Sequence, residues 1–353
     1  TRPLSFAGKA LPNRFCALPL EGGAANPNGS PGRLTMRRYT RYAQGGFVLI
    51  WLEAVAVREE ARSGPHQLWI HPRNAETFAE LVREIRKTAK NRFGHDVIVM
   101  LQLAHAGRYS RPAGTPRPIL VHHNPALDQA QGIAESQPLA TDEYLDGLQG
   151  HYVEAARLAA EAGIDGVDVK SCHKDLVSEL NAASTRPGQY GGRFEHRTRF
   201  LMETVGAIRA KMPNLLVGTR LSVFDAVPYP HGFGVDKDDY RTPDLKEPLR
   251  LVQLLKQAGI ALLNVSVGSP NAESGEYPLQ AVDRVISITR KIQKACPEVP
   301  VVAGGLSWLR EFLPHVAAGV IQGGGASIVG MGRSAFAYPD APADILKTGR
   351  MDP

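Results

Sequence analysis

Short apolar runs alternate along the chain with segments in which apolar residues recur every three or four positions. Several of the short runs, such as VIVMLQL at residues 97–103, are rich in Val and Ile and apolar on both faces. This pattern is typical of parallel strands that are covered on both sides. We therefore predict eight strands, at residues 15–20, 47–57, 97–103, 164–169, 215–223, 260–267, 299–303 and 327–331.

Helical periodicity fills the intervals between these runs. At residues 75–91 the apolar side chains form one stripe, with charged residues opposite, which predicts a surface helix with one buried face. Thr141 can cap a further helix that ends at Gly163. Other helices are predicted at residues 197–211, 248–257, 281–296 and 308–318.

Eight strands with helices between them predict an α/β protein that folds as a (β/α)8 TIM barrel, a single domain over residues 1–353. A doubly wound open sheet is the rival architecture, but its Gly-rich turn usually follows the first strand. Here the tight glycine pairs follow the seventh and eighth strands. The long polar segment 106–139 is interpreted as a loop excursion after the third strand, at the catalytic face.

Composition and charge exclude several classes of protein. With 43% hydrophobic and 22% charged residues, the 353-residue chain is an ordinary globular protein, neither disordered nor fibrous. The net charge of +6, from 41 basic and 35 acidic residues, is too even to indicate nucleic-acid binding. No run of ~18 apolar residues predicts a membrane-spanning helix. With no signal peptide and three scattered cysteines we expect a cytoplasmic protein without disulfides or a metal site.

In a TIM barrel, functional residues lie at the carboxyl ends of the strands. Gly304 and Gly305 follow the seventh strand, and Gly332 and Arg333 follow the eighth. Backbone N–H groups can approach an anion closely where no Cβ intrudes, and an arginine adds charge-assisted hydrogen bonds. These turns therefore predict a phosphate site, although two plain helix-entry turns would have the same sequence.

Two other strand ends carry polar groups that suit a flat heterocycle. Gln102 ends the third strand and Arg220 lies in the fifth. An amide and a guanidinium can together meet a ring that has both donors and acceptors. The alternatives are a core amide for Gln102 and a salt bridge from Arg220 to a barrel acid such as Glu53.

The fourth strand ends in a cluster of ionisable residues. Lys170 lies at the strand end and His173 follows it, so the two could donate hydrogen bonds to one substrate oxygen. Asp175, if ionised, would pair with Lys170 or Lys174.

Taken together, these segments resemble the old yellow enzyme family of FMN-dependent ene-reductases and NADH:flavin oxidoreductases. The resemblance covers nearly the whole chain and depends on the order and spacing of several motifs, none of which is specific alone. They are Asn13-Arg14, the segment QLAHAGR at 102–108, Tyr190-Gly191-Gly192, Arg197, Arg199-Phe200, Gly304-Gly305 and Gly332-Arg333.

The resemblance implies a TIM barrel that holds one FMN, which NADH or NADPH reduces and which then passes hydride to an activated alkene. It places Gln102 and Arg220 on the flavin ring, with Lys170 and His173 on the substrate oxygen. The backbone of Pro19, Leu20 and Ala54 would lie against the ring, and the flavin phosphate would be held by Gly304, Gly305, Gly332 and Arg333.

Three positions depart from the family pattern. Lys170 stands where the family usually has His, and Asp175 stands where it has the proton-donating Tyr. Glu21 replaces the Cys or Thr that tunes the flavin. Tyr109, Asp175 and Tyr190 are therefore the candidate proton donors, and the charge of Lys170 favours an anionic or carboxylate-bearing substrate.

We expect an FMN-dependent oxidoreductase that takes hydride from NADH or NADPH and reduces a small activated molecule such as an α,β-unsaturated carbonyl. Two alternatives stay open: a flavin-binding barrel with a drifted catalytic pair that acts as a redox partner or carrier, and a non-redox barrel enzyme acting on a sugar phosphate. The expected partner is a small-molecule substrate, with no nucleic acid and no membrane. Relatives in the family that the chain resembles form monomers, dimers and larger rings, and the sequence does not select among these states, so a homo-oligomer stays an open alternative. An iron–sulfur cluster is expected only if the chain continues past Pro353 into a cysteine cluster.

Two groups of residues are predicted to have no functional role. Arg33, Arg37, Arg38 and Arg41 fall at helical spacing and are interpreted as one solvated helix face. His122, which lies in the predicted excursion, is expected at the surface.

Overall fold

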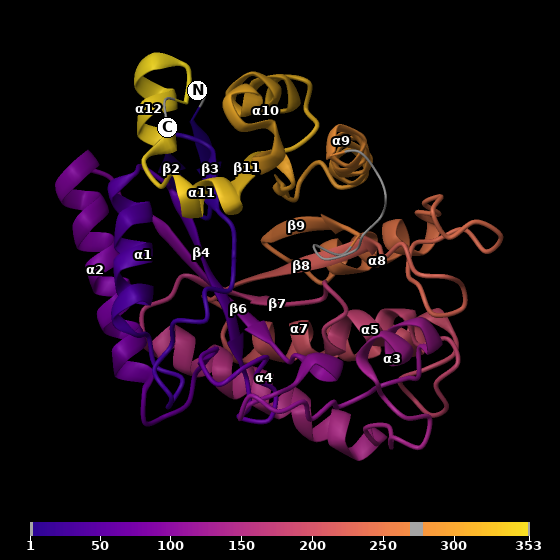
Figure 1. Cartoon of the computed structure of the whole chain (residues 1–353). Coiled ribbons are helices and arrows are strands. Elements are labelled where there is room, and N and C mark those ends of the chain that lie inside the picture. Colours follow the sequence, from indigo (N-terminus) through magenta and orange to yellow (C-terminus); the bar gives the residue numbers. More distant parts are fainter. Residues whose placement is uncertain (1–2, 269–277, 352–353) are drawn as a thin grey trace.

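The computed structural model describes residues 3–268 and 278–351 and shows the predicted TIM barrel (Figure 1). Eight parallel strands pair in a ring, which closes because the first of them pairs with both the second and the last. All eight predicted strands are confirmed. They are β3 (Phe15–Ala17), β4 (Leu49–Ala56), β6 (Ile98–Ala104), β7 (Gly166–Val169), β8 (Leu216–Phe224), β9 (Leu262–Val267), β10 (Val301–Ala303) and β11 (Ile328–Met331).

Helices surround this ring of strands. Thr141 caps α4 as predicted, because its hydroxyl accepts a hydrogen bond from the backbone N–H of Tyr144 at 3.1 Å. Within the described residues no helix is long and apolar enough to cross a membrane. The main helices are α1 (Arg33–Gln44), α2 (Ala75–Phe93), α4 (Asp142–Glu161), α7 (Arg199–Lys211), α8 (Lys246–Gln257), α9 (Pro278–Ala295) and α10 (Leu313–Gln322). Smaller elements are β5 (Leu68–Trp69), α5 (Leu176–Ala182), α6 (Phe194–Arg197), α11 (Arg333–Ala337) and α12 (Ala341–Thr348).

The helix predicted at residues 308–318 is wrong in part, because the chain bends in its middle. A 3₁₀ segment, η2 (Leu306–Phe312), comes before α10. Arg310, inside η2, has φ 48° and ψ −122°, which a right-handed helix cannot accommodate. The prediction therefore merged two short helices into one.

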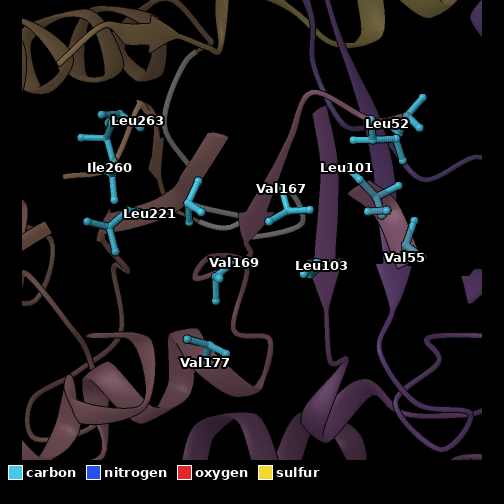
Figure 2. Close-up of a cluster of buried hydrophobic side chains, with 14 of the residues drawn as sticks. Leu52, Val55, Leu101, Leu103, Val167, Val169, Val177, Leu221, Ile260 and Leu263 are labelled. Atoms are coloured by element: carbon cyan, nitrogen blue, oxygen red, sulfur yellow. The ribbon is translucent and has the colours of Figure 1, made fainter. Parts of the chain in front are cut away.

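The strands separate two apolar layers. Side chains that point outward pack against the helices, and Figure 2 shows part of this layer, including Leu101, Leu103, Val167 and Val169. Alternate residues point into the barrel and form a second cluster, as the period of two in a strand requires. This inner cluster includes Cys16, Leu49, Trp51, Ile98, Met100, Leu262, Val302 and Ile328.

A two-stranded hairpin covers the end of the barrel at which the strands begin. It pairs β1 (Leu4–Phe6) with β2 (Lys9–Leu11), and Phe6 and Leu11 pack into the inner cluster. The Lys9 ammonium lies 3.2 Å from the carboxylate of Asp165, the residue before β7. The opposite end of the barrel, where the strands finish, is left for the site.

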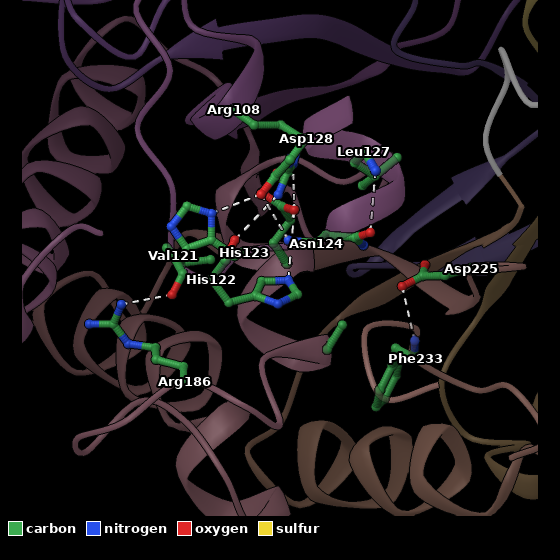
Figure 3. Close-up of polar contacts among 12 residues, drawn as sticks. Arg108, Val121, His122, His123, Asn124, Leu127, Asp128, Arg186, Asp225 and Phe233 are labelled. Atoms are coloured by element: carbon green, nitrogen blue, oxygen red, sulfur yellow. Dashed lines mark hydrogen bonds and ion pairs between the residues drawn. The ribbon is translucent and has the colours of Figure 1, made fainter. Parts of the chain in front are cut away.

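The excursion at residues 106–139 carries a short 3₁₀ segment, η1 (Gly107–Tyr109), and α3 (Pro125–Gln131). Arg108 anchors it, because its buried guanidinium lies 2.7 Å from Asp128 of α3 (Figure 3) and 2.6 Å from Glu179 of α5. The Arg186 guanidinium donates to the carbonyl of Val121 at 2.8 Å. His122, predicted at the surface, is buried instead.

All three cysteines of the chain are free thiols and all are buried. Cys16 belongs to the inner cluster, and Cys172 lies just after β7. Cys296 packs in the outer core, the apolar layer between the strands and the helices. Burial raises the pKa of the Cys172 thiol to about 12 and that of Cys296 to about 11, so both stay protonated at neutral pH.

Candidate active site

Two glycine turns lie together where β10 and β11 end. The first, residues 304–305, leads into η2, and the second, residues 332–333, opens α11. The hydroxyl oxygens of Ser307 and Ser334 are 3.0 Å apart, and the backbone N–H of Ser334 also donates to Ser307 at 3.2 Å. The two turns predicted to bind one phosphate are therefore joined to each other.

The glycines leave room for a ligand in front of these turns. A Cβ atom on Gly332 would meet nothing within 4 Å, and one on Gly304 would meet only Leu18 Cδ1 at 3.5 Å and the Val265 carbonyl at 3.8 Å. Gly305 has a φ of +77°, a conformation that other residues rarely adopt. Such a cradle suits an anionic group that approaches the backbone N–H groups.

A buried polar layer crosses the barrel from β6 to β8. Gln102 donates from Nε2 to Asp168 Oδ2 at 2.6 Å, and the backbone N–H of Arg220 donates to Asp168 Oδ1 at 2.7 Å. Burial raises the pKa of Asp168 to about 6, although Gln102 and Arg220 oppose that shift. Asp168 thus fixes the side chain of Gln102 and the backbone of Arg220, the two residues that the sequence singled out for a flat ring.

Three buried polar atoms next to this layer have no partner among the described residues. They are Nε of Arg220 and both side-chain atoms of Asn264. Arg220 and Asn264 are direct neighbours in the register of β8 and β9. Since buried polar atoms in proteins are nearly always hydrogen-bonded, this pair fits the edge of a heterocyclic ligand such as a flavin.

Lys170 is buried at the centre of an ionic cluster whose third member, Glu21, is exposed. Its Nζ lies 2.8 Å from Asp175 Oδ2 and 3.4 Å from Glu21 Oε1. Burial alone lowers the pKa of Lys170, but the two carboxylates raise it above its ordinary value, so the ammonium stays charged. The predicted pairing of Asp175 with Lys170 is confirmed. Burial raises the pKa of Asp175 to about 6 against the opposing effect of Lys170.

His173 lies on a strained turn beside this cluster. His173 and Lys174 have φ values of 62° and 60°, which non-glycine residues adopt at a cost of about 1–3 kcal/mol each. The His173 ring nitrogen Nε2 lies 3.4 Å from the hydroxyl of Ser266 on β9. Burial, and then the charges of Arg220 and Lys170, hold the pKa of His173 well below its usual value, so the imidazole is neutral.

Of the two tyrosines predicted as proton donors, the structure brings one near the ionic cluster. Tyr109 lies in η1, where burial and the Glu179 and Asp175 carboxylates raise its pKa to about 12. The hydroxyl of Tyr190 instead donates to Asp146 of α4 and accepts from Gln149 at 3.1 Å. The Tyr190 hydroxyl therefore lies in the layer of helices outside the barrel.

Glu53 has a different partner from the one considered in the sequence analysis. Its Oε1 lies 3.0 Å from Nη1 of Arg38, and its Oε2 accepts from the backbone N–H of Gly22 at 2.7 Å. Arg38 is thus turned inward from α1, and its assignment to a solvated face is wrong. Arg33 and Arg37 are exposed as expected.

The backbone positions predicted to face a ring lie next to the same polar groups. The carbonyl of Pro19 accepts from the Arg220 guanidinium at 3.3 Å, and that of Leu20 accepts from Arg38 at 3.0 Å. Ala54 on β4 is buried and aligned with Gln102 on β6.

Two residues of the site were not singled out by the sequence analysis. Asp168 interrupts the apolar run of the fourth strand, and Asn264 interrupts that of the sixth. A polar residue in an otherwise apolar strand was the available signal. It becomes specific only when the register shows which neighbours share its face of the sheet.

Comparison with known proteins places these features in context. A model of the NADH:flavin oxidoreductase / NADH oxidase family matches residues 2–352. The chain is 24% identical to the NADH-dependent flavin oxidoreductase iliE of Hypocrea jecorina, over 96% of this chain and 86% of the relative. It is also 24% identical to cinnamate reductase of Clostridium sporogenes, over 98% of this chain but only 52% of that relative. The chain thus spans about half the length of that second protein.

Solved structures share the fold. The old yellow enzyme homologue of Zymomonas mobilis superposes with a TM-score of 0.75 at 20% identity, over 99% of this chain and 93% of the other. At this level of identity the likeness extends to the barrel and not to the chemistry of individual side chains.

Proposed function

Because the chain belongs to the NADH:flavin oxidoreductase / NADH oxidase family, we propose that it passes hydride from NADH or NADPH, by way of bound FMN, to a small alkene conjugated with a carbonyl group. The observation that carries the substrate assignment is the buried, charged Lys170 beside His173 at the end of β7. The two can donate hydrogen bonds to one oxygen, where negative charge develops as hydride reaches the β-carbon.

The chain offers suitable groups for the ring and the phosphate of FMN. When bound, FMN supplies a ring that accepts hydride from the nicotinamide and returns it to the substrate. Gln102 and Arg220 would bind the ring, against the backbone of Pro19, Leu20 and Ala54. The glycine turns at residues 304–305 and 332–333, with the side chain of Arg333, would hold the phosphate.

The charges around Lys170 favour a neutral carbonyl over an anionic substrate. Above a pH of about 6, where Asp175 is mainly ionised, Asp175 and Glu21 together place two negative charges against the one positive charge of Lys170. A carboxylate brought to this cluster would be repelled, whereas a carbonyl oxygen needs only one free N–H of the ammonium. The anionic substrate that Lys170 alone suggested is therefore the weaker proposal.

Reduction of the alkene also needs a proton for the α-carbon. Asp175 holds the position of the family tyrosine, and its raised pKa of about 6 keeps part of it protonated near that pH. We assign the proton to the Asp175 carboxyl, with Tyr109 as the second candidate. Hydride on the β-carbon and a proton on the α-carbon complete the saturated product.

The proposal is tested with freshly purified protein. We expect a yellow chromophore, identified as FMN after release, that bleaches on anaerobic addition of NADH or NADPH and recovers colour with 2-cyclohexenone. Protein that bleaches but is not reoxidised by the enone supports a redox carrier. Colourless protein that takes up no FMN contradicts the proposal and supports the sugar-phosphate alternative.

A further inference from the structure

Asn264 occupies an unusual position inside the barrel. Its side chain is completely buried, yet neither its Oδ1 nor its Nδ2 has a hydrogen-bond partner. Leaving a buried polar group unpaired costs about 1–3 kcal/mol, so an amide with both ends unpaired destabilises the folded protein. A ligand that pairs with the amide would remove this cost.

The strand pattern shows where Asn264 points. Leu262, two residues earlier on β9, packs in the inner cluster, whereas Leu263 and Val265 pack in the outer core. Since alternate residues share a face, Asn264 points into the barrel, one step closer to the strand ends than Leu262. Ser266, the next residue on this face, reaches His173 at 3.4 Å. Asn264 therefore lies between the apolar interior and the proposed substrate groups.

Arg220, the neighbour of Asn264 on β8, also has a buried polar atom without a hydrogen-bond partner among the described residues. Arg220 is aligned with Asn264 in the parallel register, and its buried Nε is also unpaired. The two side chains together present three unpaired N–H donors, one on Arg220 Nε and two on Asn264 Nδ2, and one oxygen acceptor, Asn264 Oδ1. This set is complementary to the pyrimidine edge of a flavin, where a ring nitrogen and a carbonyl accept and the adjoining N–H donates.

We propose that Asn264 is a ring-binding residue, which holds the pyrimidine edge of FMN together with Arg220. The inference rests on the proposed function, since it needs FMN as the ligand. It adds a ring contact from β9 to the one proposed for Gln102, whose Nε2 also donates to Asp168.

The test replaces the amide with an apolar group of similar size, Asn264→Leu, and measures FMN binding to the apoprotein by quenching of flavin fluorescence. We expect the Kd to rise about tenfold, the effect of losing roughly one net hydrogen bond. The melting temperature of the apoprotein should hold or rise, because the unpaired buried amide is gone. A purely structural amide would give the opposite pattern, with lower stability and an unchanged Kd.

A second variant keeps the test decisive if the leucine disturbs packing. Asn264→Asp preserves shape but replaces the donor with a negative charge, which opposes an electron-rich reduced ring. We expect it to lower the midpoint potential of the bound flavin, which spectroelectrochemical titration measures. Thr204→Val is the control, since the buried Thr204 hydroxyl on α7 is also unpaired but lies in the helix layer.

The outcomes separate the two proposals. An unchanged Kd in Asn264→Leu, or an unchanged potential in Asn264→Asp, overturns the role of Asn264 and indicates that solvent satisfies its amide. A higher Kd for FMN in Thr204→Val as well would show that the loss of binding is not specific to position 264. This result also overturns the proposed role of Asn264. If wild-type protein binds no FMN, the proposed function fails instead.

Discussion

At the scale of single residues, three departures from the family pattern turn out to be one feature. Glu21 lies far from Lys170 and Asp175 in the sequence, yet the three side chains form a single ionic cluster. A lysine buried alone would lose its charge or destabilise the fold. The two carboxylates remove that cost, so the change at position 170 explains the changes at positions 175 and 21.

Lys170→Met tests the oxygen-binding role. A hydrogen bond from a charged donor contributes about 1.5–3 kcal/mol, so the KM for an enone should rise roughly tenfold to a hundredfold. The Kd for FMN should change little, because the proposed ring contacts come from other side chains. Steady-state kinetics and flavin titration measure the two quantities. Lys256→Met, at the surface pair with Glu298, is the control, and an enone KM like that of wild type would count against the role.

Asp175 predicts a pH dependence. Its pKa is raised to about 6, so the carboxyl is protonated below that pH and ionised above it. Only the protonated form can supply a proton. Reoxidation of the reduced protein by an enone should therefore slow as pH rises through about 6, while reduction by NADH stays level. Stopped-flow absorbance follows both steps.

Asp168 has a similar pKa of about 6, so the pH step needs a specific control. Asp175→Asn should abolish the step and slow reoxidation at every pH. If the variant keeps the pH profile of wild type, another group donates the proton, and Tyr109 becomes the next candidate.

The sequence predicted four site residues because each is a polar side chain inside or just after an apolar run: Gln102, Arg220, Lys170 and His173. It could not predict the contacts between them. Asp168 meets Gln102 from 66 residues away, and only the parallel register of β6 and β7 brings them together. The inward turn of Arg38 was missed for a related reason, since helical spacing alone does not show which side of α1 faces Glu53.

At the scale of elements, apolar runs located the eight strands of the barrel because strands in a covered parallel sheet are apolar on both faces. The short strands β1, β2 and β5 were not predicted. The same reasoning failed at η2 and α10. Apolar residues continue through the bend at Arg310, so the periodicity shows no interruption, and only Pro314 marks a new helix start. The excursion was interpreted as a loop because segment 106–139 is long, polar and proline-bearing, and this composition does not show that a charged residue such as Arg108 is buried.

The anchor of the excursion predicts a large effect on stability. Arg108→Met would leave the buried carboxylates of Glu179 and Asp128 without their cation. Breaking a buried ion pair from one side typically costs about 3–5 kcal/mol of unfolding free energy. Urea denaturation measures the change.

Arg157→Met is the matched control for this variant. Arg157 also pairs with two carboxylates, Glu154 and Glu161, but on the exposed side of α4. Its loss should leave stability close to wild type, because exposed ion pairs contribute little. Equal urea midpoints for the two variants would show that the excursion is not held by Arg108.

At the scale of the whole molecule, the closed ring of strands separates the two ends of the barrel, so that a local change at one end leaves the residues at the other end in place. The hairpin of β1 and β2 completes the interior at one end, and the polar site occupies the other. We expect the chain to unfold as one domain, since one ring of strands holds both ends together.

Leu11→Ala tests this separation. Leu11 is buried in the inner cluster, and truncating such a leucine usually costs about 2–5 kcal/mol. The enone KM and the Kd for FMN should stay as in wild type, because the site lies at the opposite end. Urea denaturation, flavin titration and kinetics check the three quantities, with the exposed Leu34→Ala as control. Weakened FMN binding in Leu11→Ala would show that the ends are coupled.

The burial of Cys16, Cys172 and Cys296 gives the molecule a practical property. Thiol-reactive dyes attack the ionised and accessible form of cysteine, which the folded chain does not present. A reporter group can therefore be attached to one engineered surface cysteine while the native ones stay in place. Conversely, the appearance of dye-reactive native thiols would time the opening of the barrel.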